Sequence, residues 1–447
     1  MDKQALPVGI SAAVAAIADG LIEPQQLTQA YLERITQAEA ELGAWAFLDP
    51  QYALKQAQKA DYMRRAGRDI GPLHGVPLGV ADVVDTQDMP CEWGSPYYSG
   101  RQCAEDAQLV SVLRAAGAVL LGKCATSECG LLTEGKTRHP QATAQPVLGG
   151  AAGSAVAVAS GMLPGAVALQ GEGDLIQAAA QCGIVGYVPS AGLISRRGVM
   201  PRSPTLDHMG VLTRTLDDAA LLAQTLMVYD DADKQMSLCA RPRLVKGVGA
   251  QPPVLPRFGV VQTPPWDRAD TAMQASMGEL LEALSAHTET ENFPLSSAYA
   301  AILDGFNTLF SVELAHSLSA IIPETAQHTL SPALHQRLAA AQTVSATEYL
   351  RVLEQRQRLR RELEPLFLWC DVLITPASHG AIGCCDQATL PLFSLPWSFL
   401  GLPTLTLPLF EDESGLPMGL QLVGAPYGDS RLLRTANWLL RQLVNPR

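Results

Sequence analysis

The stretch from Gly149 to Gly198 constrains the fold of this chain most, because glycine and alanine dominate it and charged residues are few. Such a density of small residues is typical of backbone segments that approach one another closely inside a protein. A flexible linker does not fit, since apolar residues such as Val156, Leu163 and Val167 interleave the stretch. We therefore expect a tightly packed helix from Ser154 to Ser160, deep in the fold.

Short apolar runs alternate with helical patterns on either side of this stretch. Pro77–Val80 predicts a buried strand, and Asp106–Ala116 predicts a helix that ends at Gly117. Further runs with the character of strands are Val119–Gly122, Val372–Ile374, Leu402–Leu409 and Leu420–Val423. Alternation of this kind predicts an α/β protein with a mostly covered sheet.

The 447 residues could form several domains, but we favour a single domain over 1–447. The clearest composition shift is rich in proline and glycine, yet it contains a strand-like run at Phe258–Val261, so we interpret it as a surface excursion. The predicted parts are N-terminal helices (1–70), a core (71–225), the excursion (226–265), a mainly helical region (266–370), and a return to the sheet with a C-terminal helix (371–447).

Composition narrows the classes of function. The formal net charge is -12 and no basic stripe is present, which argues against nucleic acid and anionic membranes as partners. No apolar run is long enough to span a membrane, and the first residues lack the pattern of a signal peptide. The nine cysteines are scattered without metal-binding spacing. We expect a cytoplasmic protein with reduced thiols, without a cofactor or a metal. The sequence is compatible with a homo-oligomer.

Three segments together resemble the amidase signature family. The first is GPLHGVPLGVADVVDT at Gly71–Thr86, continuing to Lys123; the second runs from GKTRHP at Gly135 to Thr215; the third is Gly401–Leu433. With the N-terminal helices, the resemblance covers nearly the whole chain. It implies an α/β fold in which helices sandwich one large mixed sheet.

Members of this family hydrolyse amides with a Ser–Ser–Lys triad. A neutral lysine takes a proton through a bridging serine from the nucleophilic serine, which is inert at its own high pKa. Backbone N–H groups of a glycine-rich turn hold the oxyanion. In this chain Ala81 stands at the lysine position, Gly150 at the bridging serine and Asp174 at the nucleophile. The spacing from Gly150 to Asp174 is that of the family, so these are substitutions and not a slipped alignment.

The resemblance thus implies an amidase fold without its triad. Asp174 lies in the turn Gln170-Gly171-Glu172-Gly173-Asp174, where two carboxylates would repel an anionic intermediate. We expect no catalytic residue, and a protein that binds a partner subunit or a small neutral or cationic ligand, with this turn as the candidate contact. The alternative is a hydrolase of amide or other C–N bonds that uses Asp174 and Glu172 instead.

Further expectations concern the surroundings of the turn. Ala81, Gly150 and Asp174 should converge on one cleft, and a buried Asp174 needs a hydrogen-bond donor or a raised pKa. A cation site built from Asp174, Glu172 and Asp82 is a less favoured interpretation. We expect His74 to bond backbone, Cys124 and Cys182 to be buried thiols, and the polar residues Glu134, Lys136, Thr137 and Arg138 to form a loop beside the site.

Overall fold

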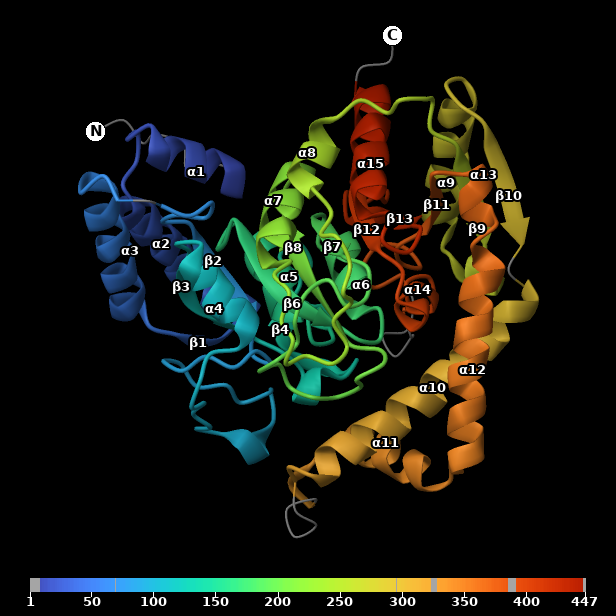
Figure 1. The fold of residues 1–447 in the computed structure, drawn as a ribbon, viewed down its shortest axis with the longest axis horizontal. Coiled ribbons are helices and arrows are strands. Elements are labelled where there is room, and N and C mark those ends of the chain that lie inside the picture. Colours follow the sequence, from blue (N-terminus) through green and yellow to red (C-terminus); the bar gives the residue numbers. More distant parts are fainter. Residues whose placement is uncertain (1–8, 69, 295, 323–327, 385–390, 445–447) are drawn as a thin grey trace.

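The structure is a computed structural model that describes residues 9–68, 70–294, 296–322, 328–384 and 391–444. Residues 1–8, at the start of the predicted N-terminal helices, and residues 445–447, at the C-terminal end, lie outside the described part. Figure 1 shows one sheet that extends across the molecule, with helices on both sides of it.

The sheet has eleven strands, and chain segments from both ends of the sequence contribute to it. In spatial order they are β1 (Trp45–Leu48), β3 (Val119–Cys124), β2 (Pro77–Ala81), β6 (Gly165–Gln170), β8 (His208–Thr213), β7 (Val185–Val188), β12 (Thr404–Glu411), β13 (Pro417–Gly424), β11 (Val372–Pro376), β9 (Phe258–Gln262) and β10 (Thr290–Pro294). Strand β2 is parallel to β3 and β6, β9 is parallel to β10 and β11, and the other pairs are antiparallel. The predicted α/β fold with a large mixed sheet is confirmed.

Most helices pack against this sheet, and α10, α11 and α12 extend from it together (Figure 1). The helices are α1 (Ile10–Ala18), α2 (Pro24–Leu42), α3 (Pro50–Arg65), α4 (Gln108–Ala115), α5 (Ala152–Ala159), α6 (Asp174–Gln181), α7 (Leu216–Leu226), α8 (Leu244–Gly249), α9 (Thr271–Ser285), α10 (Ser296–Ser319), α11 (Pro332–Gln342), α12 (Ala346–Leu363), α13 (Leu366–Trp369), α14 (Leu395–Leu400) and α15 (Asp429–Val444). Among the described residues, none of these helices combines the length and apolar character that crossing a membrane requires.

The glycine- and alanine-rich stretch forms the packed interior that its composition predicts. Helix α5 starts at Ala152, slightly before the predicted Ser154, and its residues 152–158 are buried. A Cβ on Gly153 would lie 2.5 Å from backbone atoms of Ala125 and Ala44, so only glycine fits there. The close approach lets α5 lie directly on the strands β2, β3 and β6.

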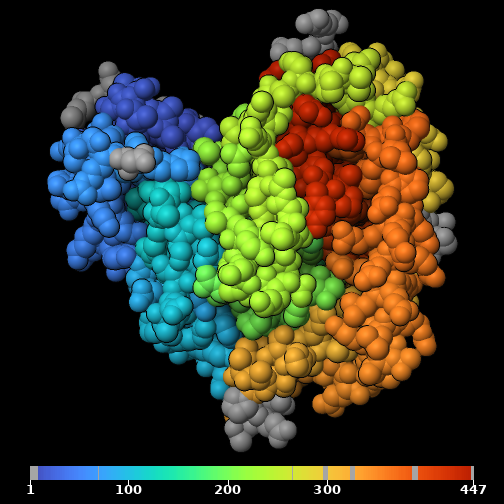
Figure 2. All heavy atoms as spheres, in the orientation of Figure 1, coloured from blue at the N-terminus to red at the C-terminus, as the bar shows by residue number. Residues whose placement is uncertain are grey.

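Two strands were missed in regions that we expected to be helical. Both are short edge strands: β10 is largely exposed and carries no apolar pattern, whereas β1 is apolar throughout but only four residues long, too short to stand out between helical patterns. The excursion 226–265 contains helix α8 as well as strand β9, and Val248 of α8 accepts a hydrogen bond from Asn437 of α15 at 2.6 Å. Figure 2 shows this yellow-green segment lying over the surface, from the middle of the molecule to the red and orange C-terminal region.

Candidate functional site

A tight turn, residues 170–174, joins strand β6 to helix α6 and holds the five residues predicted to contact a ligand. Gly173 has a φ of 92°, a left-handed conformation that strains residues with a Cβ. A Cβ on Gly171 would lie 2.0 Å from Nη2 of Arg202, so the turn packs directly on a buried guanidinium. The amide of Gln170 is buried and hydrogen-bonded within the protein through both its oxygen and its nitrogen.

The carboxylate of Asp174, the residue at the nucleophile position, turns back onto the backbone. It accepts the N–H of Gly150 at 2.8 Å and the N–H of Gly171 at 3.4 Å. Asp174 is also the first residue of α6, where the helix dipole favours a negative charge. The donor that we expected for this buried carboxyl is therefore present, and it is supplied by the position of the bridging serine.

The raised pKa that we expected for Asp174 is present as well. Burial raises the pKa of this carboxyl to about 6, against the opposing charge of Arg202 and with a smaller upward effect from Glu172. Around neutral pH most of the Asp174 carboxyl is ionised, although its environment penalises that charge.

The structure brings two of the three triad positions into contact and places the third on the same edge of the sheet. Gly150 and Asp174 are joined by the hydrogen bond just described. Ala81 is the last residue of β2, which is parallel to β6, so it lies at the same carboxyl edge as the turn 170–174. A Cβ on Gly150 would lie 3.1 Å from backbone atoms of Gly130, which leaves little room for a serine there.

A buried lysine lies close to Ala81, but its ammonium group is already engaged. Lys123, on the neighbouring strand β3, is fully buried. Its Nζ lies 3.5 Å from the Asp82 carboxylate and donates to the carbonyl of Val84. Both contacts engage its amino group, so Lys123 is not free to replace the lysine that is missing at Ala81.

Arg202 is a site residue that our sequence reasoning missed. Its guanidinium is buried, pairs with Asp207 at 2.9 Å and donates to the carbonyl of Gly130. The positive charge counteracts the rise in the pKa of Asp174 that burial causes. Its sequence surroundings hold other charged residues, such as Arg197 and Asp207, so no local signal marked it.

The second carboxylate of the turn, Glu172, does not add free negative charge as we had expected. Its Oε1 lies 2.7 Å from Nη2 of Arg337 on helix α11, and its Oε2 accepts the N–H of Leu132 at 2.7 Å. That expectation is corrected because the compensating arginine comes from a helix more than a hundred residues away in sequence, where no local pattern indicates it.

Two adjoining cavities share Thr133 and Ala333 in their walls, and the first of them borders the turn. The first, of about 560 Å³, is lined by Glu172 and Arg337 together with residues of α10 and α11. The second, of about 670 Å³, is more acidic, with four carboxylates and one lysine: Asp82, Glu92, Glu128, Glu134 and Lys136. Of the turn residues, Glu172 forms part of a cavity wall.

The remaining predicted residues have mostly structural surroundings. His74 contacts the carbonyl of Ala60 at 3.0 Å, as expected, and Cys124 and Cys182 are buried. The segment Glu134–Arg138 is not a loop but the strand β4, paired with β5 (Pro146–Leu148), because its register with β5 satisfies backbone groups that a loop would leave to water. Two of its polar side chains still reach the second cavity.

The less favoured cation site does not form. Within the described part of the chain, Asp82, Glu172 and Asp174 do not come together as a set of ligands. Asp82 instead pairs with Lys123, and Glu172 pairs with Arg337. The only such grouping among described residues consists of Asp85, Cys91 and Cys103, beyond the end of β2.

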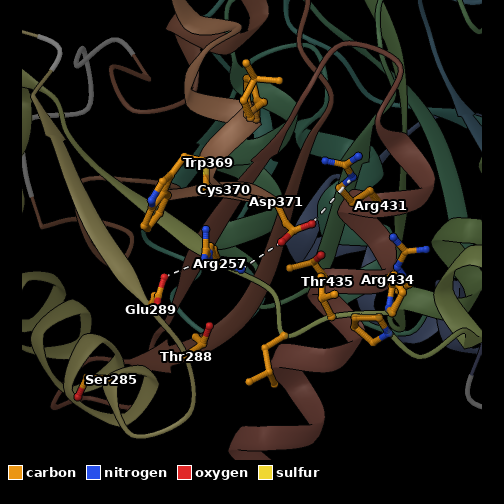
Figure 3. Close-up of a pocket in the computed structure, with 16 residues that line it drawn as sticks. Arg257, Ser285, Thr288, Glu289, Trp369, Cys370, Asp371, Arg431, Arg434 and Thr435 are labelled. Carbon is orange, nitrogen blue, oxygen red and sulfur yellow. Dashed lines mark hydrogen bonds and ion pairs between the residues drawn. The ribbon is translucent and has the colours of Figure 1, made fainter.

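A larger cavity, of about 980 Å³, lies elsewhere and is drawn in Figure 3. It is at the amino ends of β9 and β11, where Arg257 pairs with Glu289 at 3.0 Å and Asp371 lies 3.9 Å from Arg431. This cavity is therefore separate from the turn 170–174, which follows the carboxyl end of β6. We take the two cavities beside the turn as the candidate site, because Glu172 of the turn lines the first and Asp82, which follows Ala81, lines the second. Ala81, Gly150 and Asp174 themselves are buried behind these walls and line neither cavity.

Known proteins are similar to this chain over most of its length. A family model described as Amidase matches residues 26–433. A glutamyl-tRNA(Gln) amidotransferase subunit of Chloroflexus aggregans is 30% identical over 466 residues, covering 96% of this chain and 95% of that protein. Putative amidase AmiD of Mycobacterium bovis is 30% identical over 432 residues, covering 92% and 89%. The structure of peptide amidase from Stenotrophomonas maltophilia is similar with a TM-score of 0.83 and 27% identity, covering 97% of this chain and 96% of that one.

Proposed function

Because this chain belongs to the amidase signature family, we propose that it is a non-catalytic member that binds a partner protein or a small neutral or cationic ligand. The observation that carries the proposal is the position of the Asp174 carboxylate. It stands where the nucleophilic hydroxyl would be, and it accepts the N–H groups of Gly150 and Gly171.

This arrangement is unsuited to acyl transfer in two ways. Donors that stabilise a developing oxyanion must be free to do so in the transition state, and here backbone N–H groups already bind a carboxylate. A carboxylate also repels an anionic intermediate beside it. Loss of a complete triad costs a factor of about 10⁶ in turnover, and the remaining rate depends on an oxyanion site of the kind that Asp174 disturbs.

The cavities favour a neutral or cationic ligand over a carboxylate. In the second cavity Asp82 pairs with Lys123 and Glu134 with Arg138, but Glu92 and Glu128 remain. The one lining lysine, Lys136, already donates from Nζ to the carbonyl of Trp45. In the first, Arg337 and Glu172 neutralise each other. A protein partner is supported by the relative from Chloroflexus, which is named as one subunit of an amidotransferase.

The alternative is a hydrolase of amide or other C–N bonds in which Asp174 and Glu172 replace the triad. One observation favours it: the pKa of Asp174 is raised to about 6, within the range where a carboxyl can serve as acid or base near neutral pH. Against it stands Ala81, since an enzyme that changes its nucleophile has no reason to discard its candidate base.

An amide panel with the purified chain separates the two. We expect no hydrolysis of primary amides or peptide amides above an Asp174→Asn control, and no labelling by fluorophosphonates, because the triad positions hold no hydroxyl. Turnover by the wild type that Asp174→Asn abolishes would establish the alternative. Co-purification with a subunit encoded by a neighbouring gene, lost when Glu172 and Arg337 are both changed to glutamine, would support binding at this site.

A further inference from the structure

Two cysteines that the proposed function does not use lie together just beyond the end of strand β2. The spacing of Cys91 and Cys103 in the sequence matches no short cysteine motif. The chain folds back between them and brings the two side chains together. The N–H of Cys91 donates to the carbonyl of Arg101 at 3.0 Å. The two sulfur atoms and a carboxylate oxygen of Asp85 all lie within 4.8 Å of one another, and both thiols are free.

The two thiols have different surroundings. Cys91 is completely buried, and its Sγ–H can donate to the carbonyls of Asp82 and Val84, each at 3.3 Å. Cys103 is 9% exposed and accepts a hydrogen bond from Nη1 of Arg101 at 3.2 Å. Of the two, Cys103 is the one that a small reagent reaches from solvent.

The guanidinium that contacts Cys103 is held firmly. Arg101 donates to both carboxylate oxygens of Asp85, at 2.8 and 3.1 Å. Its guanidinium also lies 4.1 Å from the ring centroid of Trp93. A fixed positive charge beside a sulfur stabilises its thiolate, which is the nucleophilic form.

The pKa values of the two thiols diverge accordingly. The contact with the Cys91 thiol lowers the pKa of the Cys103 thiol, and the charge of Arg101 lowers it further, whereas burial and the Asp85 carboxylate oppose the shift. Burial raises the pKa of Cys91, which keeps that thiol protonated in the resting state. The pair therefore combines a thiolate that can attack a reagent, Cys103, with a protonated thiol that can then form a disulfide with it, Cys91.

A metal ion fits this cluster poorly. Arg101 occupies both oxygens of Asp85 and contacts Cys103, so a cation would have to displace a guanidinium and then lie beside it. Cys91, moreover, has its proton directed toward two carbonyl groups. The contacts favour redox chemistry of the two sulfurs over ligation.

We propose that Cys91 and Cys103 form a reversible disulfide when the protein encounters hydrogen peroxide. The Cys103 thiolate attacks a peroxide oxygen, an S–O bond forms, the O–O bond breaks, and the departing hydroxide takes a proton to give water. The sulfur of Cys91 loses its proton and attacks that of Cys103, so that the S–S bond forms, the S–O bond breaks and a second water leaves. Two thiols are oxidised and one peroxide is reduced.

The disulfide would alter the wall of the candidate site. Oxidation removes the Sγ–H of Cys91, so the carbonyls of Asp82 and Val84 lose that donor. Asp82 lines the acidic cavity, and the carbonyl of Val84 is also the acceptor for Lys123. Oxidation is thereby coupled to the segment that follows Ala81, whatever the ligand of the cavity is.

The experiment treats the reduced, purified full-length chain with a small excess of hydrogen peroxide and maps the thiols by non-reducing peptide mass spectrometry. We expect a peptide cross-linked between Cys91 and Cys103 in most chains, which dithiothreitol reverses. In Cys91→Ala, dimedone should label Cys103, whereas in Cys103→Ala it should leave Cys91 unlabelled. Cys239→Ser, which removes an exposed thiol elsewhere, should retain the cross-link.

The wild-type measurement alone is decisive if a variant fails to fold. The proposal is overturned if Cys91 and Cys103 both remain alkylatable while Cys239 is oxidised, or if Cys103 proceeds to sulfinic acid with Cys91 still reduced. Stoichiometric zinc in the purified protein that protects both thiols from peroxide would overturn it as well. None of these outcomes depends on whether the protein hydrolyses amides.

Discussion

At the scale of single residues, the informative substitution is Asp174, whose carboxylate accepts hydrogen bonds from backbone N–H groups of the protein. Asp174 stands at a helix N-terminus, accepts two N–H groups and lies beside the charge of Arg202, and these contacts offset part of the cost of burying it. The offset is incomplete, since burial still raises the pKa of its carboxyl to about 6. The ionised form of this residue therefore lowers the stability of the fold.

Asp174→Asn tests this through the pH dependence of unfolding. Because the pKa of Asp174 is raised on folding, its contribution to stability is complete below pH 3.8 and is lost as the pH rises through about 6. An asparagine keeps an acceptor for Gly150 without the charge. We expect the variant to exceed the wild type by about 2 kcal/mol at pH 7 and to match it near pH 4, in denaturant titrations.

A suitable control is Asp19→Asn, because Asp19 is exposed after the end of α1 and should behave as an ordinary surface position. If Asp174→Asn is less stable than the wild type at pH 7, the carboxylate is better stabilised by its donors and Arg202 than we infer.

At the scale of elements, one ion pair ties helix α11 to the turn 170–174. Glu172 is almost fully buried, whereas Arg337 is partly exposed, and they meet at 2.7 Å. The pair links the helices α10 to α12, which extend from the sheet, to the site at the end of β6. The neutrality of the first cavity depends on this contact.

Arg337→Gln should destabilise the protein by about 2 kcal/mol, because it leaves the carboxylate of Glu172 buried without its cationic partner. Adding Glu172→Gln should restore much of the loss, since the uncompensated charge is then gone. Thermal unfolding of the wild type, both single variants and the double variant gives the coupling directly.

The comparison is Arg358→Gln, which breaks a pair with Glu362 in which both side chains are more than half exposed. Such surface pairs contribute little, so its unfolding should be close to that of the wild type. Equal effects of Arg337→Gln and Arg358→Gln would mean that the tie between α11 and the turn contributes nothing beyond an ordinary surface pair.

At the scale of the whole molecule, stability depends on how closely α5 approaches the sheet. Gly153 of α5 lies against the backbone of Ala125 and Ala44, and a Cβ there would be 2.5 Å from their atoms. Ala44 and Ala125 directly adjoin the ends of β1 and β3 and are joined by a hydrogen bond from the N–H of Ala125 to the carbonyl of Ala44 at 2.8 Å, so their backbone has little room to move. The small residues of this stretch therefore set the spacing of the central layers.

Gly153→Ala should cost at least about 2 kcal/mol or prevent soluble expression, because one methyl group forces a helix away from the sheet. The matched change is Gly278→Ala in α9, where the added Cβ meets no atom within 4 Å. There we expect a gain of up to about 1 kcal/mol from helix propensity. Similar melting temperatures for the two variants would refute the packing argument.

Local patterns predicted the strands β2, β3, β9, β11, β12 and β13 and the helices α4 and α5, because apolar periodicity and glycine stops are written into short stretches. The central strands β6, β8 and β7, in contrast, were not predicted. The edge strand β10 was missed because it is exposed and needs no apolar pattern, and β1 was missed because it has only four residues. The family fold followed from motif order, and the residues at the triad positions followed from spacing.

The sequence by itself determined the α/β fold and the identities of Ala81, Gly150 and Asp174. Only the tertiary structure decided what surrounds them. Arg202 and Arg337 neutralise the turn from distant segments, and Cys91 meets Cys103 through a folded-back chain. Propensity and periodicity act over a few residues, whereas charge compensation and thiol pairing depend on distances that are set when remote segments pack together.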